Sequence, residues 1–140
     1  MLATQAALLS AVVTILAIIL YMTMGFRVGV MRGKHKIDAP AMTGHPELER
    51  AVRVQSNTLE AFPVFLPALW LATIYFTMIG WLAPAFGLVW VIGRILYMQG
   101  YMADPSKRSL GFGISLLAQI GLLLLAIVGI VMAWTAVTAT

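Results

Sequence analysis

Long apolar stretches alternate with short polar stretches along the chain, and this pattern predicts four membrane-spanning helices. The apolar stretches cover approximately residues 2–30, 46–79, 84–103 and 106–136. Each is long enough for the ~20 residues that a helix needs to cross a hydrocarbon core of ~30 Å. Helices joined by short connections pack as antiparallel neighbours. We therefore predict an all-α fold, a transmembrane antiparallel four-helix bundle that forms a single domain over residues 1–140.

Prolines refine the prediction for the second helix. Pro46, followed by Glu47 and Glu49, is typical of a first helical turn, where carboxylates face the positive end of the helix dipole. Pro63 and Pro67 lie further along the same stretch, and each removes a backbone donor. We predict a bend there, which neighbouring helices can tolerate in a membrane.

Composition excludes a soluble domain and any chemistry based on cysteine. Hydrophobic residues make up 61% of the chain and charged residues 10%, whereas a soluble domain carries roughly a quarter charged residues. The chain contains no cysteine, so any thiol must be brought in by a ligand. His35 and His45 lie in a predicted loop without partners at ligand spacing, so we predict exposed side chains and no metal site.

The basic residues of the connections lie at one face of the predicted bundle. The second connection and both termini contain no lysine or arginine. The first connection (residues 27–46) and the third contain Arg27, Arg32, Lys34, Lys36, Lys107 and Arg108. By the positive-inside rule, these connections face the cytoplasm and both termini face the opposite side.

The chain has a net charge of +4, and its basic residues lie at helix ends beside the membrane. This position indicates an anionic small ligand or membrane lipids as partners and no nucleic acid. The short chain, in which we find no retention signal, favours a bacterial inner membrane.

Several polar side chains of the second and third helices are not explained by membrane insertion, and Arg53, Glu60 and Arg94 lie too deep to serve as orientation signals. The polar side chains share one helix face each, at spacings of three and four residues: Arg50, Arg53, Asn57 and Glu60 on the second helix, and Arg94, Tyr97 and Tyr101 on the third. A charged side chain within a span costs at least a few kcal/mol and is usually paired or lines a polar cavity. We predict an ion pair between Arg94 and Glu60, which lie at similar depths. Together these residues predict a donor-rich pocket for a ligand with more than one carboxylate, because guanidinium binds carboxylate with two hydrogen bonds.

Simpler interpretations remain open for each of these residues taken singly. Arg50 and Arg53 could contact lipid phosphates at the membrane surface. The predicted pair of Arg94 and Glu60 could serve only to hold two helices in register. The tyrosines could be ordinary core or interface aromatics.

Two segments of the chain resemble the signature sequences of the MAPEG family, the membrane-associated proteins of eicosanoid and glutathione metabolism. The first is PELERAVRVQSNTLEAFP at residues 46–63, and the second is GRILYMQGY at residues 93–101, followed by DPSKRS at residues 104–109. The order, the spacing and the four-span layout agree over essentially the whole chain. The most similar branch contains microsomal glutathione transferases 2 and 3 and leukotriene C4 synthase, and the strings NTLE and PSKRS are most like microsomal glutathione transferase 3.

The resemblance implies a homotrimer of four-helix protomers, with active sites at the subunit interfaces on the cytoplasmic half. It implies a glutathione transferase whose cosubstrate is glutathione and whose second substrate, a lipophilic electrophile or a lipid hydroperoxide, approaches from the bilayer. Arg108 matches the catalytic arginine that stabilises the glutathione thiolate. The positions that match glutathione-binding residues are Arg32, Arg53, Gln55, Asn57, Glu60, Arg94, Tyr97 and Tyr101.

Two departures from the synthase pattern argue against leukotriene C4 synthesis more than against glutathione binding. Gly33 replaces the second of two neighbouring arginines, and Ala61 replaces an aromatic residue beside the glutamate of the second helix. A non-catalytic lipid-binding scaffold, as in the five-lipoxygenase-activating branch, is the alternative, although it has no need of a thiolate-stabilising set. A transporter is disfavoured because the far halves of the spans are apolar.

Overall fold

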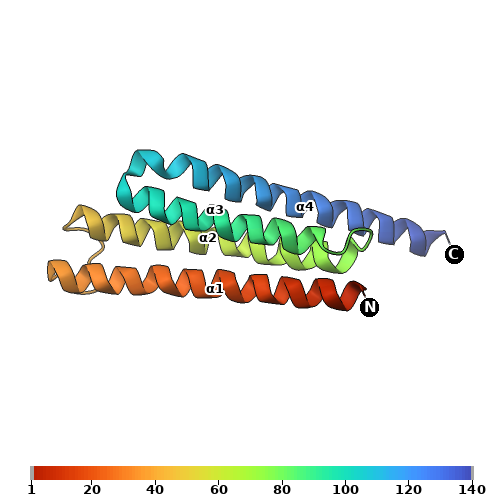
Figure 1. The fold of residues 1–140 in the computed structure, drawn as a ribbon, viewed down its shortest axis with the longest axis horizontal. Coiled ribbons are helices and arrows are strands. Elements are labelled where there is room, and N and C mark those ends of the chain that lie inside the picture. The colour runs from red at the N-terminus through yellow and green to blue at the C-terminus, as the bar shows by residue number, and fades with distance from the viewer. Residues whose placement is uncertain (1, 140) are drawn as a thin grey trace.

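The computed structural model describes residues 2–139 and places four α-helices side by side in an elongated bundle (Figure 1). The elements are α1 (Leu2–His35), α2 (Pro46–Tyr75), α3 (Leu82–Ala103), the short 3-10 helix η1 (Pro105–Arg108) and α4 (Ser109–Thr138). All four α-helices are long and apolar enough to cross a membrane, which fits an integral multi-pass membrane protein. Both termini lie at one end of the bundle, and the α1–α2 and α3–α4 connections lie at the other, which we call the connection end (Figure 1). The predicted all-α four-helix bundle is confirmed.

The first helix extends further toward the connection end than the sequence predicted. We predicted a first span of about residues 2–30 and a polar connection over residues 27–46, whereas α1 continues to His35. The last turn of α1 contains Arg32 and Lys34, and cations there are stabilised by the negative end of the helix dipole. The helix ends where Lys36 adopts a positive φ of 55° and the Ile37 N–H donates to the Arg32 carbonyl at 3.1 Å.

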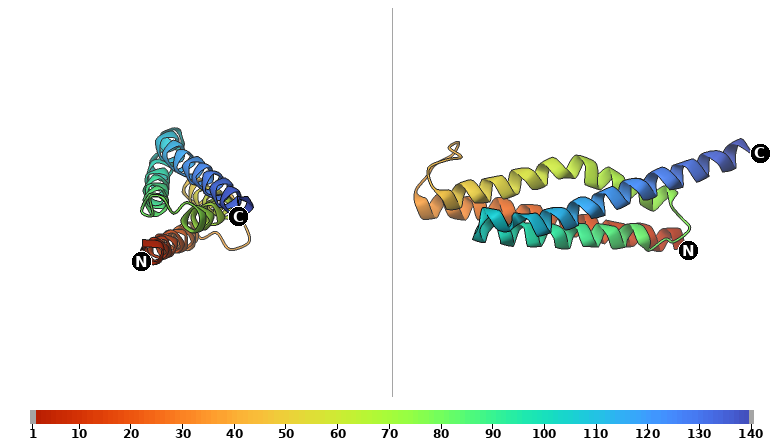
Figure 2. Two further views of the ribbon diagram at one scale, coloured as in Figure 1. Left: turned by 90° about the vertical axis from the view of Figure 1, so that its right-hand side faces the viewer. Right: turned by 90° about the horizontal axis from the view of Figure 1, so that it is seen from above.

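The second helix bends where its prolines lie. Pro63 and Pro67 are both inside α2. The right-hand view of Figure 2 shows α2 changing direction in this yellow-green part of the chain. The bend predicted from the missing backbone donors is therefore present.

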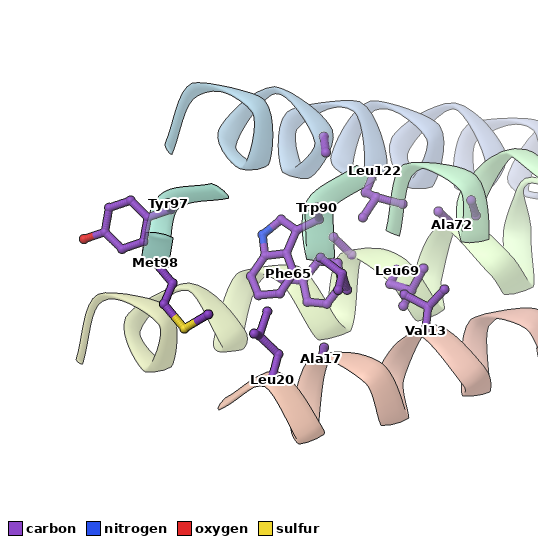
Figure 3. Packing of buried hydrophobic residues seen from close by; sticks show 14 of the residues in the cluster. Val13, Ala17, Leu20, Phe65, Leu69, Ala72, Trp90, Tyr97, Met98 and Leu122 are labelled. Carbon is purple, nitrogen blue, oxygen red and sulfur yellow. The ribbon is translucent and has the colours of Figure 1, made fainter. Parts of the chain in front are cut away.

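An apolar core fills the bundle between the connection end and the termini (Figure 3). Phe65 stacks on Trp90 with ring centroids 3.8 Å apart and planes 5° apart, and both side chains are fully buried. Leu122 of α4 is also fully buried, so three helices contribute to this layer. Nearer the termini, the hydroxyls of Ser10 and Thr73 form a buried hydrogen bond of 2.7 Å between α1 and α2.

Two glycines let α3 and α4 approach until their backbones touch. A Cβ on Gly111 would lie 2.1 Å from the Tyr97 backbone nitrogen, and a Cβ on Gly93 would lie 2.7 Å from the Ser115 backbone nitrogen. Small residues at such crossings are characteristic of membrane helix packing. This contact fixes Tyr97 of α3 relative to the first turn of α4.

Candidate functional site

A cleft of about 310 Å³ opens at the connection end between α2, α3 and the start of α4. Its lining residues are Arg53, Asn57, Tyr97, Arg108, Ser109 and Phe112. Arg53 and Asn57 are four residues apart and therefore share one face of α2. The cleft brings together four of the residues that the sequence predicted for the site, and it combines cations, an amide and aromatic rings.

Arg94 lies behind the cleft and holds one of its residues. Its side chain is buried, and Nη1 donates to Asn57 Oδ1 at 2.7 Å. Its guanidinium carbon also lies 5.2 Å from the centre of the Trp90 ring and 5.4 Å from that of Tyr97. Arg94 therefore positions Asn57 and does not itself line the cleft.

The predicted ion pair between Arg94 and Glu60 is wrong. Glu60 is exposed, and among the described residues its carboxylate forms no ion pair. Asn57 and Glu60 point about 60° apart around α2, because three residues turn a helix through about 300°. Asn57 faces α3 and accepts the hydrogen bond, whereas Glu60 faces outward.

Arg53 and Arg108 place two exposed positive charges at the cleft. Within residues 2–139 neither guanidinium forms an ion pair. The guanidinium carbon of Arg108 lies 5.8 Å from the centre of the Tyr101 ring. Both cations are thus available to an anionic ligand.

The short helix η1 carries Arg108 to the cleft, and Asp104 begins it. Asp104 Oδ1 accepts a hydrogen bond of 2.8 Å from the Ser106 N–H. This hydrogen bond from the Ser106 backbone N–H stabilises the charged carboxylate and lowers the pKa of Asp104. A charged cap at this corner fixes the turn that leads from α3 to Arg108.

A second hollow of about 400 Å³ adjoins the cleft, and Arg53 lines both. Tyr101, which the sequence predicted for the glutathione site, lines this second hollow. Arg50 also lies here, and its Nη1 is 3.3 Å from the carbonyl oxygens of Met102 and Ala103. Arg50 therefore ties α2 to the C-terminal end of α3.

Two further predicted residues lie outside the cleft, on the α1 side of α2. Arg32 Nη1 donates to the Ala41 carbonyl at 2.6 Å and lines a hollow in the α1–α2 connection. Gln55 packs against α1, because a Cβ on Gly25 would lie 3.0 Å from Gln55 Nε2. Within one protomer, the structure does not bring Arg32 or Gln55 to Arg108.

Ser109 and Phe112 line the cleft but were not predicted from the sequence. They follow Arg108 by one and four residues, so Phe112 lies above Arg108 on the same helical face. The Phe112 ring lies 6.3 Å from that of Tyr97, which closes one wall of the cleft with aromatic surface. The spacing from Arg108 was the signal that could have indicated Phe112.

The prediction that His35 and His45 are separate, exposed loop residues is wrong. Both are half-buried, and their rings stack with centroids 3.4 Å apart. His35 is the last residue of α1 and His45 caps α2, so the connection between these helices brings the two rings together.

Comparison with known proteins identifies relatives of the whole bundle. A sequence model of the MAPEG family matches residues 10–128. An uncharacterized protein of Synechocystis sp., sll1147, is 42% identical over 120 residues, which cover 86% of each chain. Human microsomal glutathione S-transferase 2 is 41% identical over 123 residues, covering 88% of this chain and 82% of that protein. Leukotriene C4 synthase of Cavia porcellus is 38% identical over 100 residues, covering 71% of this chain and 65% of that protein.

Proposed function

The chain belongs to the MAPEG family, and from that premise we propose that it is a membrane-bound glutathione transferase that activates the glutathione thiolate. The observation that carries the proposal is the meeting of Arg53, Asn57 and Arg108 around one cleft at the connection end. Relatives include human microsomal glutathione S-transferase 2 and leukotriene C4 synthase, which supports the same class of chemistry.

Arg108 is the residue to which we assign thiolate stabilisation. A cysteinyl thiol has a pKa of about 8.5, so it is mostly protonated at neutral pH, while the thiolate is the nucleophile. A guanidinium within hydrogen-bond reach favours the charged form and lowers that pKa. Lowering it by about 2 units requires ~2.7 kcal/mol. Arg108 is exposed in one protomer, so we propose that a neighbouring protomer and the ligand shield it from water and strengthen its effect. Because Arg108 forms no ion pair within residues 2–139, its charge is available for this task.

We assign glutathione binding to Arg53, Asn57 and Tyr97, with Arg94 in support. Arg53 is suited to a glutathione carboxylate because its planar guanidinium can donate two parallel hydrogen bonds to the two carboxylate oxygens. The Asn57 oxygen already accepts from Arg94, so its amide N–H groups remain for the ligand. Arg94 is therefore a positioning residue, and its buried Nε has no hydrogen-bond partner among the described residues.

We propose that the functional unit is a homotrimer in which a neighbouring protomer completes the cleft. Arg32 and Gln55 lie on the α1 side of their own protomer, so they can reach the ligand of Arg108 only from another copy. Co-expressed Arg32→Ala and Arg108→Ala chains test this sharing. Mixed trimers should recover activity that neither variant has alone, because some interfaces then combine an intact Arg32 with an intact Arg108. Mixed trimers as inactive as each variant would contradict shared sites.

The second substrate is proposed to be a lipophilic electrophile or a lipid hydroperoxide that approaches from the bilayer. The exposed Phe112 ring offers apolar surface beside Arg108 at the mouth of the cleft. In one case the thiolate sulfur bonds to an electrophilic carbon and a leaving group such as halide departs. In the other it attacks the O–O bond and releases an alcohol, and a second glutathione converts the resulting sulfenic acid to glutathione disulfide and water. We also propose that the protein lies in a bacterial inner membrane with its connection end on the cytoplasmic side, because the positive-inside rule places basic connections there.

A glutathione-dependent assay of the detergent-purified protein tests the proposal. The assay compares an activated aryl halide with a lipid hydroperoxide, and isothermal titration measures glutathione binding in the same preparation. We expect turnover of at least one substrate and loss of binding in Arg53→Ala, while Lys107→Ala, a cation outside the cleft lining, stays like wild type. Absence of binding at millimolar glutathione would refute the proposal and favour the non-catalytic lipid-binding scaffold.

A further inference from the structure

The two histidines of the chain meet at the connection end together with Glu47. The ring planes of His35 and His45 are 15° apart. His35 Nε2 lies 2.7 Å from Glu47 Oε2, and the Glu47 N–H donates to His45 Nδ1 at 3.2 Å. One ligand atom from each of the three residues lies within 4.8 Å of the other two. We propose that His35, His45 and Glu47 form a binding site for a divalent transition metal of the zinc type.

The donor set selects this class of cation. Two imidazole nitrogens and one carboxylate oxygen suit zinc, nickel or copper, whereas magnesium and calcium prefer oxygen ligands alone. Zinc binds such atoms at about 2.0–2.2 Å, so neighbouring ligand atoms around a tetrahedral ion lie roughly 3.3–3.5 Å apart. The separation of 2.7 Å between His35 Nε2 and Glu47 Oε2 is shorter than that value, and all three ligand atoms lie within 4.8 Å of one another. Binding would require the side chains to rotate until the three atoms reach ligand spacing.

Two adjustments accompany binding. A metal lies close to the plane of each imidazole that binds it, so the nearly parallel rings must tilt apart. Lys34 Nζ lies 2.6 Å from Glu47 Oε2, and this ion pair must break when the oxygen binds the metal. The Lys34 side chain is 54% exposed, so its ammonium can turn into solvent, and such exposed pairs contribute little stability. The Glu47 side chain is 40% exposed, which leaves room for water as a further ligand.

The metal would join the end of α1 to the start of α2 across the connection of residues 36–44. None of its three ligands lines the cleft of Arg53 and Arg108. Binding should therefore raise the thermal stability of the protein and leave its affinity for glutathione unchanged. The site does not depend on the proposed transferase function, and either can fail without the other.

Titration of full-length protein in detergent with zinc chloride tests the site directly. The protein carries no polyhistidine tag and is first treated with a chelator. We expect one zinc per chain, a rise in melting temperature and no comparable response to magnesium. Cobalt should give the visible absorbance of a tetrahedral site.

Variants that keep the local hydrogen bonds separate a metal site from a structural cluster. His35→Gln retains a side chain that can donate to Glu47, and His45→Asn retains a good helix cap. Each should weaken zinc binding because it removes one of three protein ligands, and the double variant should abolish it, because the chain has no cysteine and no other histidine. Glu49→Gln is the matched control, since this carboxylate accepts from the Gly44 N–H at 3.2 Å and lies outside the cluster.

The proposal is overturned if the wild type takes up no zinc, or if the double variant binds zinc as tightly as the wild type does. Helix content by circular dichroism and unchanged glutathione binding establish that the variants fold, so a loss of zinc binding in them reports on the ligands.

Discussion

The buried hydroxyls of Ser10 and Thr73, near the termini, are paired, whereas arginine side chains near the connections keep donors without a partner among the described residues. Ser10 and Thr73 are both buried, and each hydroxyl has a hydrogen-bond partner. At the connection end, Arg94 Nε is buried and has no hydrogen-bond partner among the described residues. Arg53 and Arg108 are exposed, and neither forms an ion pair with another described residue. The positive-inside rule explains exposed cations at this end, but it does not explain a buried guanidinium nitrogen without a partner, and charged groups inside membrane spans gather at functional sites. The contrast separates a half that stabilises the bundle from a half to which we assign ligand binding.

Phe65→Ala is the substitution expected to destabilise the bundle most. It removes a fully buried ring stacked at 3.8 Å on Trp90 and leaves a cavity, at a cost of about 3–5 kcal/mol in the free energy of unfolding. Denaturation in mixed micelles, followed by circular dichroism, measures this loss. Folded protein should bind glutathione with unchanged affinity. A large fall in glutathione affinity without loss of stability would contradict the assignment of stability to one half and of binding to the other.

Asn57→Ala should affect both stability and binding. It removes the acceptor of the Arg94 hydrogen bond at 2.7 Å, which costs about 1.5–3 kcal/mol because the donor is charged and buried. It also removes an amide from the cleft, so glutathione binding should weaken. A double-mutant cycle with Arg94→Met measures the coupling. The two losses of stability should be far from additive, and strict additivity would show that the pair is not a unit.

Gly111→Ala tests whether the contact between α3 and α4 positions the cleft. The new Cβ would lie 2.1 Å from the Tyr97 nitrogen, so the helices must separate, at a cost of about 1–3 kcal/mol. Gly113→Ala is the matched control, since nothing lies within 4 Å of a Cβ there. We expect Gly111→Ala to lose stability and glutathione affinity together in the same assays, and Gly113→Ala to lose neither. Equal behaviour of the two variants would contradict the close approach.

Ser10→Ala should have the smallest effect. It removes one interhelical hydrogen bond, which contributes about 0.6 kcal/mol on average in membrane proteins. Thr73 still donates to the Leu69 carbonyl at 2.7 Å, so no hydroxyl is left without a partner. Stability should fall slightly and glutathione affinity should stay the same. A change in affinity here would mean that the terminal half also shapes the site.

The sequence predicted the four helices well because apolar length is a local property of the chain. It placed the end of α1 too early, since Arg32 and Lys34 resemble loop residues although they stabilise a helix end. It also chose Glu60 as the partner of Arg94, because opposite charges at similar depth suggest a pair. Asn57 and Glu60 point about 60° apart around α2, and Asn57 is the one that faces Arg94. Only the packing of α2 against α3 fixes that rotation.

The clusters at the connection end show what spacing alone cannot predict. His35 and His45 meet because Lys36 and Gly44 adopt positive φ values of 55° and 123°, which reverse the chain between the helices. Arg53, Asn57 and Arg108 were predicted as a set because the matched motifs contain all three. That Arg94 supports the cleft from behind follows only from its burial and its bond to Asn57.

The thiolate absorbance of bound glutathione, followed as a function of pH, tests the central claim most directly. Wild type should show the thiol titrating about 2 units below its usual pKa of about 8.5, so that thiolate is already abundant at neutral pH. In Arg108→Ala the titration should move back up toward the usual value, and activity should then rise only at higher pH. Lys107→Ala removes one positive charge from the neighbouring position, as Arg108→Ala does from its own. Bound glutathione in this control should titrate as it does in wild type. An unchanged thiol pKa in Arg108→Ala that still binds glutathione would contradict the role assigned to Arg108.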